Sequence, residues 1–231
     1  MRLVLIRHAH SEANAAGILS GRLPNVHLSE KGLAQSEQLA VRLGNFPVSN
    51  LRISPMERCF ETISPWINSI VMPNNPRFEP IIDEELTEVD YGLWSGKKLS
   101  ILSKNKLWKT VQESPSRMYF PKGEGIAQMQ SRAMTSVHQA VSSKAKGDAV
   151  IVSHGDVIKA ILADALGLHL DQFQRIVVNP CSVSVVTYTP ERPFVHRMND
   201  TSGHFASFAP PVESDEAASD AVVGGGTGDG R

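Results

Sequence analysis

Two short, uninterrupted apolar runs that each lead to a histidine constrain the fold of this chain most. Residues 3–6 (LVLI) are followed directly by Arg7 and His8, and residues 149–152 (AVIV) are followed, after one serine, by His154. A short apolar run that includes β-branched residues is typical of a strand buried on both faces of a sheet. The sequence therefore predicts at least two central strands, each ending at a histidine.

Further segments alternate with these runs. Residues 51–53 predict a third strand, and residues 182–188 and 194–198 predict two more whose pairing the pattern leaves open. Capping residues and apolar spacing predict three helices. They are expected to run from Ser29 to Leu43, from Ser54 (with Pro55 at the first helical position and Glu57 completing a capping box), and from Asp156 as N-cap to Gly167.

Buried strands that alternate with helices indicate an α/β fold, a three-layer sandwich with a mostly parallel central sheet and helices on both faces. In such sheets, ligands bind beyond the carboxyl ends of the strands. Arg7 and His8, Arg58 and His154 all follow strand ends, so we expect them to converge in one crevice although they are distant in sequence.

A crevice with two arginines and two histidines suits an anion that has several equivalent oxygens, and phosphate is the natural candidate. Guanidinium groups match phosphoryl oxygens, and the helix N-terminus after Gly155 adds N–H donors. A neutral histidine is also a competent nucleophile near neutral pH. Taken singly, each residue has a simpler interpretation, such as a loop pair or a surface arginine. Their shared position at strand ends favours a common anion site.

Five segments, in this order along the chain, resemble motifs of the histidine phosphatase superfamily, which has the phosphoglycerate-mutase-like fold. The closest likeness is to a bacterial branch usually labelled phosphomutase or phosphatase. The segments are RHAHSEAN (7–14), SPMERCFET (54–62), LTEVDYGLWSG (86–96), PKGEG (121–125) followed by Arg132, and VIVSHGD (150–156).

The resemblance implies a role for each matching residue. His8 becomes the nucleophile that accepts the phosphoryl group, and Glu88 becomes the general acid and base, with no cofactor and no metal. His154 completes the catalytic set. The phosphate-binding residues would be Arg7, Asn14, Arg58 and Gly155, and the substrate contacts would be Ser11, Gly21 and Arg22.

The chain departs from the family pattern at two places. Ala9 stands where the family commonly has glycine, which is tolerable if its φ is negative. The loop 21–28 is one residue longer than the family's GxxDxxL and lacks its acid. His10, two residues after His8, also leaves open a metallophosphoesterase, although the positive charge of Arg7 disfavours a cation there.

We expect a metal-independent phosphomonoester hydrolase that acts on a small phosphorylated metabolite through a phosphohistidine. A phosphomutase and a phosphate-binding pseudo-enzyme are the alternatives. The ERHYG segment and the RRSxDxPPP insertion of cofactor-dependent phosphoglycerate mutases have no match here, which favours hydrolysis. Residues 20–27 and 100–125 should form the rim of the pocket, unless the latter segment is instead a packed cap.

Composition limits the remaining function classes. The 231 residues carry a net charge of -1 and residues 1–211 about +3, a balance too weak to argue for a nucleic-acid surface, and no apolar run approaches a membrane span. Cys59 and Cys181 lack CxxC spacing, so no zinc or redox pair is indicated. We expect a cytoplasmic protein of open oligomeric state. Its phosphatase domain should span residues 1–211, and residues 212–231 should be a disordered acidic tail.

Overall fold

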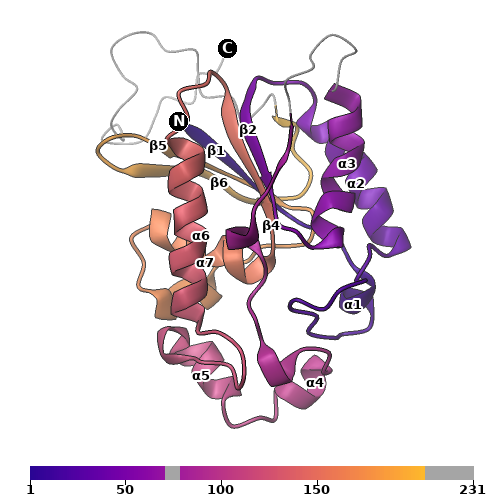
Figure 1. Ribbon diagram of the computed structural model, residues 1–231, viewed down its shortest axis with the longest axis vertical. Helices are drawn as coiled ribbons and strands as arrows, with labels where there is room; N and C mark the ends of the chain where they lie inside the picture. The colour runs from indigo at the N-terminus through magenta and orange to yellow at the C-terminus, as the bar shows by residue number, and fades with distance from the viewer. Residues whose placement is uncertain (71–78, 206–231) are drawn as a thin grey trace.

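The computed structural model describes residues 1–70 and 79–205 as one six-stranded mixed sheet with helices on both faces (Figure 1). The strand order is β3-β2-β4-β1-β5-β6. The strands are β1 (Arg2–Arg7), β2 (Val48–Ile53), β3 (Ile81–Ile82), β4 (Asp148–Ser153), β5 (Val183–Tyr188) and β6 (Pro193–Asp200). The predicted tail and the last residues of the predicted domain, 206–231, lie outside the described residues.

The sheet is parallel at its centre and antiparallel at one side. Strand β4 lies between β1 and β2 and is parallel to both, and β2 is parallel to β3. The last two strands form an antiparallel hairpin, of which β5 pairs with β1. The predicted parallel core is therefore confirmed, and the pairing that the sequence left open is antiparallel.

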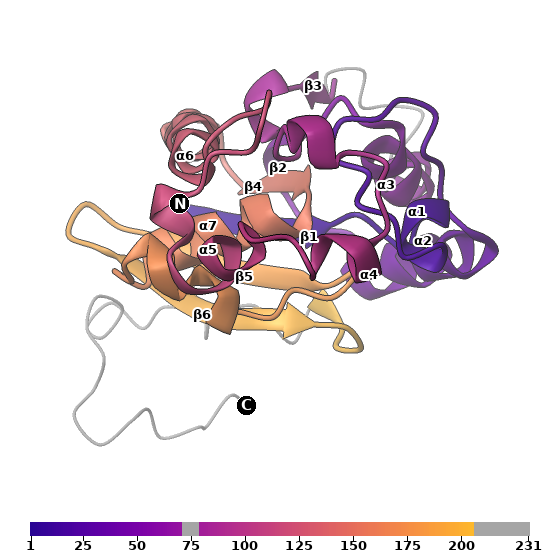
Figure 2. The same ribbon diagram turned by 90° about the horizontal axis from the view of Figure 1, so that it is seen from below.

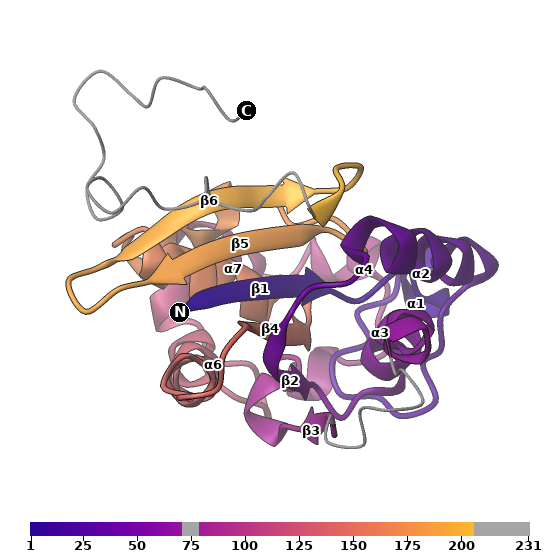
Figure 3. The ribbon, with the colours of Figure 1, turned by 90° about the horizontal axis from the view of Figure 1, so that it is seen from above.

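Four longer helices cover the two faces of the sheet, and shorter ones lie beyond the strand ends. In Figure 3, α2 and α3 lie on one side of the sheet and α6 and α7 on the other, while Figure 1 shows α4 and α5 at the lower end of the molecule. The α-helices are α1 (Glu12–Ala15), α2 (Glu30–Leu43), α3 (Glu57–Ile70), α4 (Leu99–Leu102), α5 (Trp108–Glu113), α6 (Ile126–Val141) and α7 (Gly155–Ala165); the 3-10 helices are η1 (Glu84–Leu86), η2 (Gly92–Trp94), η3 (Pro115–Arg117) and η4 (Leu170–Arg175).

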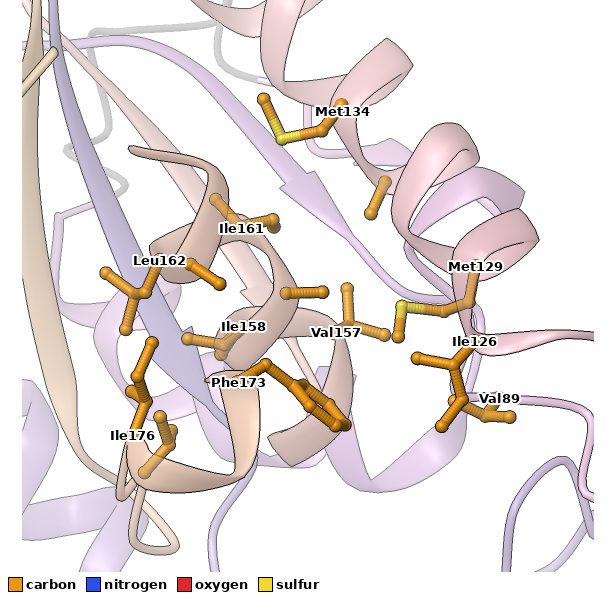
Figure 4. Close-up of a cluster of buried hydrophobic side chains, with 14 of the residues drawn as sticks. Val89, Ile126, Met129, Met134, Val157, Ile158, Ile161, Leu162, Phe173 and Ile176 are labelled. Carbon is orange, nitrogen blue, oxygen red and sulfur yellow. The ribbon is translucent and has the colours of Figure 1, made fainter. Parts of the chain in front are cut away.

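Alternate side chains of the central strands enter two separate cores. Leu3 and Leu5 of β1 pack in the core under α6 and α7, whereas Val4 and Ile6 pack in the core under α2 and α3. Figure 4 shows part of the first core, where Ile158 and other side chains of α7 meet those of α6. Because β1 is buried on both faces, its carboxyl end is held firmly, and His8 follows directly from it.

Two predicted helix starts are wrong, and both errors have a local cause. Helix α3 begins at Glu57, not at Ser54, because the Ser54 hydroxyl bonds to a ring nitrogen of His154 instead of capping the helix in a capping box. Helix α7 begins at Gly155 with His154 as N-cap, so Asp156 lies inside the first turn. Ser29 does cap α2 as predicted, and its side chain accepts a hydrogen bond from the Gly32 amide.

Candidate active site

A cavity of about 410 Å³ opens at the carboxyl ends of β1 and β4. Arg7, His8, Asn14, Glu88 and Gly155 line its inner part. Figure 2 views the molecule from this side, and residues of α4 and α5, Leu99 and Trp108 among them, line the cavity. The position agrees with the rule that open α/β sheets bind ligands beyond their carboxyl ends.

His8 presents one ring nitrogen that is free to attack. Its Nδ1 lies 2.8 Å from the Ala9 carbonyl oxygen, which can only accept, so Nδ1 carries the proton and Nε2 keeps its lone pair. Burial, with the nearby guanidinium groups of Arg58 and Arg7, lowers the pKa of His8 well below its ordinary value. The imidazole is therefore neutral near pH 7, the state that a nucleophile needs.

His154 and Arg58 lie close to His8 and to each other. The rings of His8 and His154 are 5.2 Å apart between centroids. Arg58 Nη2 donates to His154 Nδ1 at 3.1 Å and to the Gly21 carbonyl at 2.8 Å. The predicted convergence of these three side chains is observed, although they come from β1, α3 and the end of β4.

Both ring nitrogens of His154 already have protein partners. Nδ1 accepts from Arg58, so Nε2 carries the proton and donates to the Ser54 hydroxyl at 2.7 Å. Burial and the Arg58 charge lower the pKa of His154 well below its ordinary value, which keeps it neutral. In this arrangement His154 orients Arg58, and a contact between a ring nitrogen of His154 and phosphate would require one of these bonds to break.

Three arginine N–H groups at the site are buried without a partner among the described residues. They are Nε of Arg7 and Nε and Nη1 of Arg58, whose side chain is only 1% exposed. A buried donor that lacks a hydrogen bond costs about 1–3 kcal/mol, and more when it is charged. Arg7 lines the cavity, whereas neither Arg58 nor His154 does. An anion held next to His8 would therefore relieve this cost at Arg7 directly and would have to reach past the cavity lining to meet Arg58.

Asn14 lies at the cavity, whereas Ser11 supports it from behind the cavity wall. The Asn14 side-chain oxygen accepts from both the amide and the hydroxyl of Ser11, each at 3.0 Å, which leaves its NH₂ group to donate. Asn14 lines the cavity, whereas Ser11 is buried and caps α1. Ser11, predicted to contact substrate, therefore lies off the cavity wall and holds Asn14 in place.

Glu88 lines the same cavity and is almost completely buried. Burial, together with the nearby Asp156 carboxylate, raises the pKa of Glu88 from 4.5 to about 7. Its Oε1 accepts a hydrogen bond from the Val89 amide at 3.0 Å, which opposes the rise. A carboxyl group with this pKa can both donate and accept a proton near neutral pH.

The backbone of Glu88 is held by two arginines that share one carboxylate. Arg22 Nε and Arg132 Nη2 both donate to the Glu88 carbonyl, at 2.8 and 3.2 Å. Both also pair with Glu124 Oε1, at 2.8 and 2.7 Å. Arg22, predicted to contact substrate, does not line the cavity and instead fixes the position of Glu88.

Gly21, the third predicted substrate contact, does line the cavity. Its φ of +54° is in the left-handed region, and a Cβ there would lie 2.8 Å from Cδ2 of Tyr91. Only glycine therefore lets the loop approach Tyr91 while its carbonyl accepts from Arg58.

Ala9 does not disturb the site. It is not among the described non-glycine residues with positive φ, its Cβ is buried in the core under α2 and α3, and its amide donates to Thr62 Oγ1 at 2.8 Å. His10 Nδ1 pairs with Ser29 Oγ at 2.8 Å. Among residues 1–70 and 79–205, no group of three His, Cys, Asp or Glu side chains could hold a metal ion.

Sequence reasoning missed a polar network on the wall of the cavity. The Tyr91 hydroxyl donates to Asp156 Oδ2 at 2.9 Å, and Lys159 Nζ lies 3.4 Å from Asp156 Oδ1 and 3.1 Å from Gln174 Oε1. All four residues line the cavity. The signal was the Asp156 side chain itself, which follows Gly155 in the segment VIVSHGD (150–156).

The comparisons with known proteins agree with this fold. A phosphoserine phosphatase 1 from Hydrogenobacter thermophilus is 26% identical over 210 residues, which cover 90% of this chain and 96% of that protein. A 2,3-bisphosphoglycerate-dependent phosphoglycerate mutase from Thermoplasma acidophilum is 27% identical, with 79% and 85% covered. The solved structure of Bacillus stearothermophilus YhfR matches with a TM-score of 0.77 at 23% identity, over 86% of this chain and 96% of that one.

None of the helices in the described part of the chain is both long and apolar enough to cross a membrane. The family model of the histidine phosphatase superfamily (branch 1) matches residues 3–201, which include every segment described above. The chain is therefore a member of the histidine phosphatase superfamily and an enzyme of the phosphatase and phosphomutase type.

Proposed function

We propose that this protein is a metal-independent phosphomonoester hydrolase that acts through a phosphohistidine. The observation that carries the proposal is the set of orphaned guanidinium N–H groups of Arg7 and Arg58 beside the neutral imidazole of His8. Together they offer an anion site and a nucleophile in one crevice. Fixed arginines supply the charge stabilisation that phosphoryl transfer needs.

The first step forms a bond between His8 Nε2 and phosphorus and breaks the bond between phosphorus and the ester oxygen. Glu88, protonated because of its raised pKa, gives its proton to the leaving oxygen, so the product is an alcohol. Arg7, Arg58, Asn14 and the Gly155 amide hold the phosphoryl oxygens throughout. Arg7 Nη1 is itself fixed by the Val178 carbonyl at 2.6 Å.

The second step returns the enzyme to its starting state. Glu88, now ionised, takes a proton from a water molecule that attacks phosphorus, and the bond to His8 Nε2 breaks. Inorganic phosphate leaves, and Glu88 is again protonated. Hydrolysis and mutase chemistry share the first step and differ only in the acceptor.

The test is hydrolysis of an aryl phosphate with no added metal, followed by acid quench. We expect turnover and an acid-labile phosphoryl label on the wild-type protein, and neither in His8→Ala. Turnover that persists in His8→Ala would refute the mechanism, and binding of phosphate without turnover would indicate the pseudo-enzyme. Because one relative is a phosphoglycerate mutase, equilibration of 2- and 3-phosphoglycerate is the matching test for a mutase.

A further inference from the structure

The lining beyond Arg7, His8, Asn14, Glu88 and Gly155, here called the outer part of the cavity, combines aromatic and aliphatic side chains with the polar side chains of Ser20, Gln112 and Gln174. Trp94, Trp108 and Phe120 line it together with Val111 and Ile176. The rings of Trp94 and Trp108 are nearly parallel, 18° apart with centroids at 6.2 Å, and Phe120 packs edge-on against Trp94 at 5.3 Å. The group attached to a phosphate next to His8 would therefore have an aromatic and aliphatic surface on part of the cavity wall.

The charged side chains on this outer part neutralise each other. Asp156 and Lys159 are the two charged residues that line it, and they pair at 3.4 Å. Lys159 also donates to Gln174, and Asp156 accepts from Tyr91. A carboxylate on the substrate would find a lysine that is already paired and would face the negative charge of Asp156.

The nearby arginines cannot take this role either. Arg22 and Arg132 are both committed to Glu124 and to the Glu88 carbonyl. Neither lines the cavity. A substrate that carries a carboxylate close to its phosphate would therefore lose hydration without gaining a free cation in this part of the site.

On the basis of the phosphatase function above, we propose that the protein prefers phosphomonoesters of uncharged aromatic alcohols to those of short hydroxy acids. Trp108 and Val111, on α5, determine this preference because they line the outer part of the cavity, where the alcohol part of the substrate would bind. The Asp156–Lys159 pair excludes carboxylates. This substrate preference differs from the substrates named for two relatives, a phosphoserine phosphatase and a phosphoglycerate mutase.

The experiment compares kcat/KM for 2-phenylethyl phosphate, ethyl phosphate, phosphoserine and 3-phosphoglycerate, without added metal. The first two are alkyl esters with leaving groups of similar basicity, so their ratio reports the phenyl ring. One methylene in an apolar pocket changes kcat/KM by about tenfold or more, so we expect at least about a tenfold preference for 2-phenylethyl phosphate. Phosphoserine and 3-phosphoglycerate should fall below ethyl phosphate.

Variants separate the two parts of the proposal. Trp108→Ala should bring the ratio of 2-phenylethyl to ethyl phosphate towards one, and Trp108→Phe should restore most of it. Ile101→Ala is the matched control, because Ile101 is 61% exposed on neighbouring α4 and does not line the cavity; its ratio should equal that of the wild type. Asp156→Asn frees Lys159 and should raise kcat/KM for phosphoserine and 3-phosphoglycerate several-fold relative to ethyl phosphate.

Three results would overturn the preference. They are equal kcat/KM for the two alkyl phosphates, a higher value for phosphoserine or 3-phosphoglycerate than for 2-phenylethyl phosphate, and a ratio that Trp108→Ala leaves unchanged. Failure of the proposed function looks different, since turnover of every ester would then survive in His8→Ala. If the phosphohistidine forms but the enzyme shows no preference for the aromatic ester, only the proposed substrate class is wrong.

Discussion

Replacement of Glu88 by Gln should stabilise the protein at alkaline pH while it removes activity. The pKa of Glu88 rises from 4.5 to about 7 on folding, because the carboxyl group is buried and lies near Asp156. At about 1.4 kcal/mol for each pKa unit, this difference corresponds to about 3 kcal/mol. Glutamine fills the same space and cannot ionise.

The direction follows from linkage. Because the folded pKa is raised, the stabilising contribution of the protonated form is fully present below pH 4.5 and is lost as the pH rises through about 7. Above that pH, the folded wild type must either hold a buried carboxylate or keep a proton that the unfolded chain has lost. Glu88→Gln has no such loss, so its stability relative to wild type should increase by about 2–3 kcal/mol between pH 5 and pH 8.

The assay is urea unfolding of both proteins at the two pH values, with Glu113→Gln as control. Glu113 is an exposed carboxylate on α5, with 64% of its side chain accessible, so its replacement should change the unfolding free energy by less than about 0.5 kcal/mol at either pH. In parallel, turnover of ethyl phosphate by Glu88→Gln should fall about 10²–10⁴-fold, because the proton donor is lost. An unfolding difference that does not depend on pH would refute the assigned environment of Glu88.

Three further predictions concern other groups. Arg58→Met should lower kcat for an aryl phosphate about 10²–10³-fold, since it removes the buried donors beside His8, and activity within threefold of wild type would contradict the anion site. Asp83→Ala should lower the free energy of unfolding, measured by urea, by about 3–5 kcal/mol. The reason is that the largely buried Arg52 guanidinium would lose its ion-pair partner, the Asp83 carboxylate 2.7 Å away. Turnover in a chelator should match turnover without one, because guanidinium groups supply the positive charge; loss in chelator and recovery with a divalent ion would instead support a metallophosphoesterase.

Much of the fold follows from short-range patterns. The two apolar runs before His8 and His154 are the neighbouring central strands β1 and β4, and Ser29 caps α2 as the spacing predicts. Patterns failed where a side chain had a distant partner. Ser54 does not complete a capping box because its hydroxyl bonds with His154, which is one hundred positions away in the chain.

The site residues that follow strand ends could be predicted from local sequence patterns, whereas the others could not. Arg7, His8, Arg58 and His154 follow strand ends, and sheet geometry alone brings them together. Glu88 was singled out only by the family resemblance, since its neighbours are also acidic and its raised pKa depends on burial.

The residues around Glu88 were assigned less well. Arg22 was expected to touch substrate and instead fixes the Glu88 backbone, a contact across 66 positions that no local pattern reveals. Tyr91 and Asp156 meet across 65 positions for the same reason.

The features that look unfavourable in the sequence are the ones that make the site. An arginine in the first turn of α3 opposes the helix dipole, and its buried N–H groups lack partners. Two packed cores, one on each face of β1 and β4, hold these groups in place despite their cost. A phosphoryl group has oxygens for the donors and a phosphorus for His8 Nε2, so the same ligand that relieves the unfavourable contacts is the one on which the histidine can act.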